Sequence, residues 1–169
     1  MLEPNNLPEI NGNDVSSPAT DATELATPDA KLVLALDYGV KKMGMALGNT
    51  LTKNARAFDI LAMDNGQPDW DNLLGIIDKW KINQVVVGLP LNMDGSGSML
   101  SKRAHKFARR LAHRMGEERM TVEVIMVDER LTSIEARQMA WEQGWIAHER
   151  DPIDDIAACI LLDSYLSAL

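Results

Sequence analysis

Apolar residues dominate three short runs between residues 31 and 63. The runs are KLVLALD (31–37), KKMGMALGN (41–49) and RAFDILAM (56–63). Gly39, Gly48 and Asn49 lie near the breaks between them, and these residue types favour turns. Three successive strands joined by short turns predict an antiparallel meander.

The pattern becomes helical in PDWDNLLGIIDKWK (68–81). Its large apolar residues recur at helical spacing and Pro68 lies near the start, which predicts an amphipathic helix. The next run, QVVVGLP (84–90), is continuously apolar, as is typical of a strand covered on both faces. Because a helix between two strands usually forms a right-handed crossover, we expect this strand to be parallel to an earlier one.

The rest of the chain continues to alternate between helical and extended patterns. We expect helices at 98–115, 133–143 and 152–168 and a strand at 122–127. The order β, β, β, α, β, α, β, α, α predicts an α/β fold with a mixed five-stranded sheet and helices on both faces. The sequence contains no internal repeat.

Length and composition suit one globular domain, because 169 residues with 46% hydrophobic content can form a full core. Cys159 is the single cysteine, which excludes an internal disulfide framework and favours a reducing, cytoplasmic location. No apolar run approaches the roughly 20 residues of a membrane span. We also expect no signal peptide, because the N-terminus lacks a basic start and an apolar stretch.

Residues 1–30 carry six of the eight net negative charges and no Lys or Arg. This segment is rich in Pro, Asn, Thr, Ser and Ala and has no hydrophobic period, which predicts a disordered acidic tail before a domain at 31–169. The acidity of the tail would serve solubility, or it would compete for the basic surface described below.

Acidic residues occur at the predicted ends of strands. Asp37 ends the first strand, and Asp128 and Glu129 follow the strand at 122–127. Sites in parallel α/β sheets form at the carboxyl ends of the strands. Asp154 and Asp155 fall in the first turn of the last predicted helix. If that turn lies beside the sheet, carboxylates from three segments converge, which is costly unless cations neutralise them.

Each of these acidic residues also has a structural interpretation. Asp151 is a plausible N-cap with Pro152 after it, and the acidic residues that follow would favour the positive end of the helix. Asp128 and Glu129 could be solvated residues beside a strand. Asp37 is harder to explain in this way, because it interrupts apolar sequence where a strand meets a glycine turn.

The predicted helix at 98–115 has two contrasting faces. Its apolar face comprises Leu100, Ala104, Phe107, Ala108, Leu111 and Met115. Its charged face comprises Lys102, Lys106, Arg109, Arg110 and His113. No acidic residue balances this face, so phosphate contact, without choice of sequence, is favoured over a merely solvated surface.

The segment before this helix, GLPLNMDGSGS (88–98), combines three glycines with polar side chains. Ser98 could cap the helix, and exposed amides at a helix N-terminus suit a phosphate. Asn92 is a further polar group in this segment. A tight loop with ordinary capping explains the same residues equally well.

Four motifs together resemble the YqgF (RuvX) family of pre-16S rRNA nucleases, which are related to Holliday-junction resolvases. The motifs are LALDYGVKKMGMALGN, VVVGLPLNMDGSGSMLSKRAHKFARRL, VDERLTSIEAR and IDDIAACILLDSYL, in the family's order. The resemblance extends over about Leu32 to Leu166 and leaves out the leader. It implies an RNase H-like fold with carboxylates that hold divalent metal.

The resemblance implies that Asp37, Glu129 and Asp154 are the catalytic carboxylates and ligands of Mg²⁺, with Mn²⁺ as an alternative. The family commonly has Pro or Phe after the first of these, where this chain has Tyr38. We expect little effect, because adjacent side chains on a strand point to opposite faces.

A set of basic and polar residues supplies the candidates for substrate binding. They are Lys42, Asn92, Lys102, Arg103, Lys106, Arg110 and Arg130. Lys42 and Arg130 are candidates for stabilising charge in the transition state. A role for these two as surface charges or ion-pair partners remains equally open.

The resemblance favours a metal-dependent nuclease that processes the 5′ end of pre-16S rRNA, with pre-rRNA and the small ribosomal subunit as partners. Cleavage of branched DNA is an alternative and would require a two-fold dimer, so both monomer and homodimer remain open. A second alternative is a non-catalytic RNA-binding module acting in transcription or ribosome assembly. DYGVKKMG also resembles the phosphate-binding hairpin of sugar kinases and actin-like ATPases, which duplicate their fold, whereas this chain has room for one copy.

Overall fold

The computed structural model describes residues 30–90, 97–129, 133–146 and 156–169. Of Pro90, Glu129 and residues 133–137 only the backbone is described. The chain divides into Met1–Ala30 and Lys31–Leu169. The predicted disordered tail lies outside the described residues, apart from Ala30.

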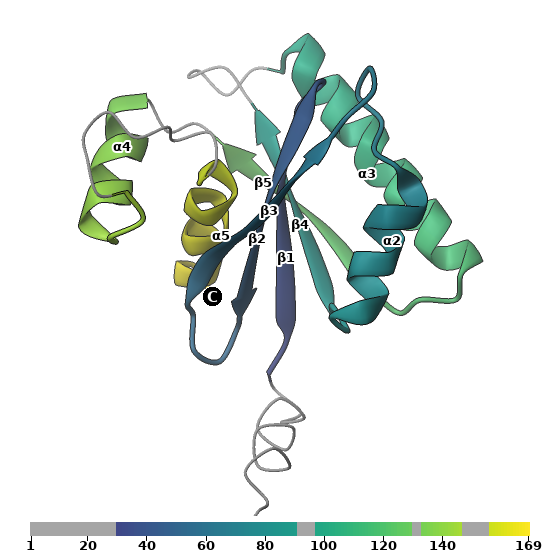
Figure 1. The fold of residues 1–169 in the computed structure, drawn as a ribbon, viewed down its shortest axis with the longest axis horizontal. Coiled ribbons are helices and arrows are strands. Elements are labelled where there is room, and N and C mark those ends of the chain that lie inside the picture. The colour runs from purple at the N-terminus through teal and green to yellow at the C-terminus, as the bar shows by residue number, and fades with distance from the viewer. Residues whose placement is uncertain (1–29, 91–96, 130–132, 147–155) are drawn as a thin grey trace, which may run out of the picture. The chain divides into compact units, whose positions relative to one another are not determined.

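The second unit contains a five-stranded sheet in the order β3-β2-β1-β4-β5 (Figure 1). The strands are β1 (Leu32–Asp37), β2 (Lys42–Asn49), β3 (Ala55–Ala62), β4 (Gln84–Pro90) and β5 (Glu123–Glu129). β1, β2 and β3 pair in antiparallel fashion, whereas β4 is parallel to β1 and β5 is parallel to β4. The predicted meander and mixed sheet are therefore confirmed, and β1 is the central strand.

The prediction for the fifth strand was wrong at its C-terminal end. β5 does not end at Val127 but continues through Asp128 and Glu129, which pair with Leu89 and Pro90 of β4. The apolar pattern ends before the backbone ladder does, because the last residues of a strand can be polar while their peptide groups still pair. Asp128 and Glu129 are thus the final residues of β5 and do not follow it.

Helices cover both faces of the sheet, as predicted. They are α2 (Trp70–Lys79), α3 (Met99–Glu117), α4 (Ser133–Glu142) and α5 (Ala157–Ser167). α2 and α3 lie on one side of the sheet, and α4 and α5 lie on the other (Figure 1). Each face of the sheet therefore has its own hydrophobic layer.

The alternation of side chains along β1 assigns its residues to these layers. Leu34 and Leu36 pack in the cluster that contains Phe107 of α3, whereas Val33 and Ala35 pack in the cluster formed with α5. Tyr38 belongs to the α2/α3 cluster. By the same alternation, the position of Asp37 belongs to the α5 face of the sheet.

The two predicted faces of α3 are also confirmed. The apolar residues from Ala104 to Met115 are buried, and Leu100 packs against the same cluster. Lys102, Lys106 and Arg110 are exposed. Ser98 is the N-cap and forms a capping box with Ser101, so the buried Ser101 hydroxyl is hydrogen-bonded.

The last helix begins at Ala157, with Ile156 at the N-cap position and no side-chain cap. The predicted start at Pro152, with Asp151 as N-cap and Asp154 and Asp155 in the first turn, lies outside the described residues. Cys159 is fully buried in the α5 layer. Burial, and then the charge of Asp163, raises the pKa of its thiol to about 11. Cys159 is therefore part of the hydrophobic core between the sheet and α5.

Candidate functional site

Asp37 is the last residue of the central strand and is half-buried. It pairs across the β1–β2 hairpin with Gly44. Gly39 follows in the turn, where a β-carbon would collide with the carbonyl oxygen of Lys42. The hairpin backbone itself therefore requires glycine at position 39, and this tight turn fixes where the carboxylate of Asp37 leaves the sheet.

The register of the sheet relates Asp37 to Glu129, although β4 lies between their strands. Leu36 pairs with Val87 and Val87 pairs with Met126, so the position of Asp37 is level with Val127. Glu129 lies two residues farther along β5. With strands about 4.8 Å apart and a rise of about 3.3 Å per residue, their α-carbons are about 12 Å apart. Both residues thus end strands at the same edge of the sheet.

Two of the three predicted metal ligands are not described as side chains. Glu129 is described as backbone only, and Asp154 lies outside the described residues. Among the described residues, no group of three or more His, Cys, Asp or Glu side chains is placed to hold a metal ion. The predicted carboxylate triad therefore remains a prediction, with the position of Asp37 as its described part.

The predicted substrate-binding residues divide into separate groups. Lys42 begins β2 and is exposed beside the hairpin turn. Lys102, Lys106 and Arg110 are exposed along α3. The remaining two, Asn92 and Arg130, lie outside the described residues.

Arg103 differs from its exposed neighbours on α3, because its side chain holds a distant turn. Its Nη2 donates to the carbonyl oxygen of Asn65 at 2.7 Å and lies 3.4 Å from the Asn65 Oδ1. Asn65 and Gly66 have positive φ angles of 49° and 83°. An isolated bridge between Asp64 and Gln67 closes this turn, residues 64–67.

The 64–67 turn is also tied to the hairpin that carries Asp37. The hydroxyl of Tyr38 donates to the Gly66 carbonyl oxygen at 2.9 Å, and the Gly66 amide donates to the Val40 carbonyl at 2.9 Å. A β-carbon on Gly66 would lie 2.5 Å from the Tyr38 hydroxyl and 2.8 Å from Arg103 Nη2. The turn is therefore fixed between the end of β1 and the start of α3.

A row of aromatic rings packs beside the 64–67 turn. The Tyr38 and Phe107 rings have centroids 5.1 Å apart, and the Phe107 and Trp70 rings are stacked at 5.5 Å. The Arg114 guanidinium lies over the Trp70 ring, 4.6 Å from its centroid. Trp70 Nε1 donates to Gln67 Oε1 at 3.1 Å. These contacts place the turn, α2 and α3 in one rigid wall.

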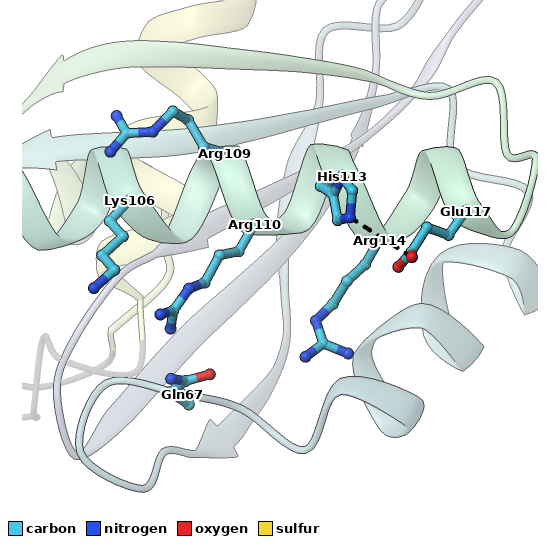
Figure 2. A pocket seen from close by; sticks show the side chains of 7 residues that line it. All are labelled: Gln67, Lys106, Arg109, Arg110, His113, Arg114 and Glu117. Atoms are coloured by element: carbon cyan, nitrogen blue, oxygen red, sulfur yellow. Dashed lines mark ion pairs between the residues drawn. The ribbon is translucent and has the colours of Figure 1, made fainter.

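A groove runs between α3 and the 64–67 turn, and we call it the α3 groove. It comprises a larger hollow of about 720 Å³ and a smaller one of about 240 Å³, which share Gln67, Lys106 and Arg110. Tyr38 and Arg103 line the smaller hollow, and Arg114 lines the larger. In Figure 2, the side chains of Lys106, Arg110 and Arg114 point to the side of the helix where Gln67 lies.

The far end of the groove is marked by acidic side chains. Glu117 lines the larger hollow, and its Oε2 lies 3.6 Å from His113 Nε2 (Figure 2). An adjoining hollow is lined by Asp71, Asp78 and Glu118. The basic stretch of the groove therefore ends at Arg114.

Sequence reasoning found Lys106 and Arg110 but missed Gln67 and Arg114 as groove residues. The helical spacing of Arg114, four residues after Arg110, was a usable indication. Gln67 gave no comparable indication, because its place in the groove depends on contacts made by distant residues.

The family model described as "RuvX: Holliday junction resolvase" matches residues 31–168. The chain belongs to the RuvX family. The match covers the whole of the sheet and its four described helices, so the resemblance predicted from four motifs is confirmed. Asp37 at the C-terminal end of β1 and the α3 groove are thus features of a RuvX-family chain.

Curated relatives of this RuvX-family chain carry a consistent name. A protein of Psychrobacter sp. (strain PRwf-1), named "Putative pre-16S rRNA nuclease", is 70% identical over 156 residues, which cover 92% of this chain and 87% of the relative. A protein of Pseudomonas savastanoi pv. phaseolicola with the same name is 44% identical over 138 residues, covering 80% of this chain and 91% of the relative.

Solved structures similar to the RuvX-family chain confirm the predicted RNase H-like fold. Thermus thermophilus RuvC aligns with a TM-score of 0.54 at 13% identity, covering 81% of this chain and 95% of that one. The fowlpox virus Holliday junction resolvase aligns with a TM-score of 0.51 at 16% identity, covering 82% of this chain and 99% of the resolvase. Because both identities are below 25%, the similarity to these two structures shows the fold alone. Within the described residues, no helix has the length and apolar character needed to cross a membrane.

Proposed function

We propose that this RuvX-family protein is a metal-dependent nuclease that trims the 5′ end of pre-16S rRNA during ribosome biogenesis. The name shared by relatives at 70% and 44% identity supports this substrate. The observation that carries the proposal structurally is Asp37, a carboxylate at the C-terminal end of the central strand, at the edge where the basic α3 groove begins. Sites in such sheets form at this edge.

The donor chemistry of the proposed site fits a hard divalent cation. Asp37, Glu129 and Asp154 would hold Mg²⁺ or Mn²⁺ through carboxylate oxygens. The alternation along β5 predicts that position 129 shares the α5 face with Ile125 and Val127, the face to which Asp37 belongs. When bound, the metal supplies charge stabilisation at the scissile phosphate and activation of a water nucleophile.

The protein's own contribution is positioning. β1 is hydrogen-bonded on both sides, to β2 and to β4, so the strand that carries Asp37 cannot shift independently of the sheet. The exposed cations of α3, Lys106 and Arg110, attract and hold the phosphate backbone. Lys42, beside the hairpin turn, is a candidate for contact with the phosphate nearest to Asp37.

Two alternatives remain from the sequence, and one of them has support from the comparisons. The family model is described as a Holliday junction resolvase, and the structural neighbours named here include resolvases. Cleavage of a four-way junction would require two copies of the chain on opposing strands, and the oligomeric state remains to be measured. A non-catalytic RNA-binding module, the small ribosomal subunit as a partner and a cytoplasmic location all remain predictions.

A panel of matched substrates tests the proposed function. We expect the full-length protein to cleave a 5′-extended 16S precursor in the presence of Mg²⁺ or Mn²⁺ and to lose this activity in EDTA. Cleavage of an unrelated single-stranded RNA and of a four-way DNA junction should be at least tenfold slower. Faster cleavage of the junction would replace the proposal by the resolvase alternative, and RNA binding without cleavage would favour the binding module.

A further inference from the structure

We propose that the α3 groove binds about five nucleotides of the substrate strand through their phosphates, on the face of the sheet opposite to the Asp37 carboxylate. The inference deepens the proposed function, on which it rests for the identity of the ligand as nucleic acid. It specifies how much of the strand beyond the scissile bond is held, by which cations, and without recognition of the bases.

The cations on the Gln67 side of the groove divide into two that are engaged and two that are available. Arg103 donates to Asn65 and Arg114 covers the Trp70 ring, so these two guanidinium groups are held in place as parts of the walls. Lys106 and Arg110 are exposed and point into the groove. No ion pair joins either of them to an acidic side chain within the part of the chain that the structure describes. Their charges are therefore available to phosphates.

The ends of the groove determine the length of strand that it can hold. Arg103 and Arg114 lie about three helical turns apart, which is about 16 Å along the helix axis. Beyond Arg114, Glu117 and the acidic side chains of the adjoining hollow repel a phosphate backbone. A strand whose bases stay stacked on one another rises about 3.4 Å per nucleotide, so the basic stretch accommodates about five nucleotides of such a strand.

Tyr38, Trp70 and Phe107 line the smaller hollow of the groove, but their rings are engaged in contacts within the protein. Phe107 is buried, and the Trp70 ring is stacked on Phe107 and covered by the Arg114 guanidinium. Stacking on aromatic rings is the usual way in which proteins hold the bases of single strands. Binding here therefore depends on the phosphates, so RNA and DNA strands of any sequence should bind with similar affinity.

The position of the groove defines the path of the strand. Asp37 belongs to the α5 face of the sheet, whereas α3 covers the other face. Tyr38, the residue after Asp37, lines the smaller hollow of the groove and is hydrogen-bonded to Gly66 of the 64–67 turn. A strand cleaved at Asp37 would cross the C-terminal edge of the sheet beside Tyr38 and continue along α3.

Binding measurements on a cleavage-deficient background test this proposal independently of catalysis. The full-length Asp37→Asn protein is titrated with fluorescent oligouridylates of 3 to about 15 nucleotides and with oligothymidylates of the same lengths. We expect affinity to rise steeply with length up to the strand that fills the groove and crosses the edge, and slowly thereafter. The Lys106→Gln/Arg110→Gln variant should bind at least tenfold more weakly at about 0.1 M salt.

The salt dependence separates the groove from general charge effects. Loss of two phosphate contacts should reduce the slope of log K against log salt by about 1.4 for a single strand. Lys31→Gln/Lys79→Gln is the matched control, because it removes the same charge from exposed side chains outside the groove. This control should leave both affinity and slope unchanged, and circular dichroism should show that all variants are folded.

Three outcomes would overturn the inference. They are equal losses in the groove variant and the control, a strong preference for one base sequence, and failure of all oligonucleotides to bind. Conversely, groove-dependent binding by a protein that cleaves no RNA would uphold the groove and contradict the proposed nuclease function. The two proposals can therefore fail separately.

Discussion

At the scale of single residues, Tyr38 shows what alternation along a strand can and cannot predict. Its direction, away from the face of Asp37, was predicted and is confirmed, because Tyr38 packs in the α2/α3 cluster. Its hydrogen bond to Gly66 could not be predicted, since the partner lies 28 residues away in a turn without regular pattern. Arg103 was predicted to bind substrate. In the structure its side chain donates a hydrogen bond to Asn65 of the same turn, and this contact could not be predicted either.

Cys159 gives a prediction about chemical reactivity. Its thiol is fully buried and has a pKa of about 11, against an ordinary value of 9.0. At pH 8 the folded protein therefore has about a hundredfold less thiolate than the unfolded chain. We expect iodoacetamide to alkylate Cys159 rapidly in urea and hardly at all in buffer, as measured by mass spectrometry.

The same pKa shift has a consequence for stability. As the pH rises above about 9, the thiol of the unfolded chain ionises before the folded one, so the free energy of unfolding should decrease between about pH 9 and 11. In the alkylation experiment, rapid modification of the native protein at pH 8 would contradict the assignment of Cys159 to the core.

At the scale of elements, the strands and the long helix were predictable, whereas the 64–67 turn was not. The apolar runs of β1 and β4 and the two-faced pattern of α3 are local features that survive in the fold. The turn is held by Tyr38, Val40 and Arg103, which come from a distant hairpin and a later helix. Local sequence therefore indicated one wall of the α3 groove and could not indicate the other.

Two glycine substitutions test the role of the turn against that of a helix interior. Gly66→Ala should destabilise the protein by about 1–3 kcal/mol, because Gly66 has a φ of 83° and its β-carbon would approach Tyr38 and Arg103. Gly75→Ala, in the middle of α2 with nothing within 4 Å of the added carbon, should stabilise it by about 0.5–1 kcal/mol.

Urea denaturation of both variants, followed by tryptophan fluorescence, gives these free energies. Gly66→Ala should also weaken binding of oligonucleotides to the α3 groove, whereas Gly75→Ala should not. Equal stability of the two variants would contradict the strain assigned to an alanine at position 66, and unchanged binding by Gly66→Ala would show that the turn does not constrain the groove.

At the scale of the whole molecule, the proposed substrate groove and the proposed catalytic carboxylate belong to separate faces of the sheet but share one edge. Asp37 ends the central strand on the α5 face, and the α3 groove begins at the same edge on the other face. The sequence predicted the layers, the family and the basic helix. Convergence of Asp37, Glu129 and Asp154 remains a prediction, because it depends on how three distant segments pack and pattern alone does not determine that.

The most direct test of the account is single-turnover cleavage of the 5′-extended 16S precursor by the Asp37→Asn protein, with its RNA affinity measured in parallel. The control is Asp59→Asn, an exposed carboxylate on β3. We predict that Asp37→Asn reduces the cleavage rate at least about a hundredfold without weakening RNA binding, because it would remove an oxygen ligand of the proposed metal site. Cleavage by Asp37→Asn at the rate of the Asp59→Asn control would contradict the account.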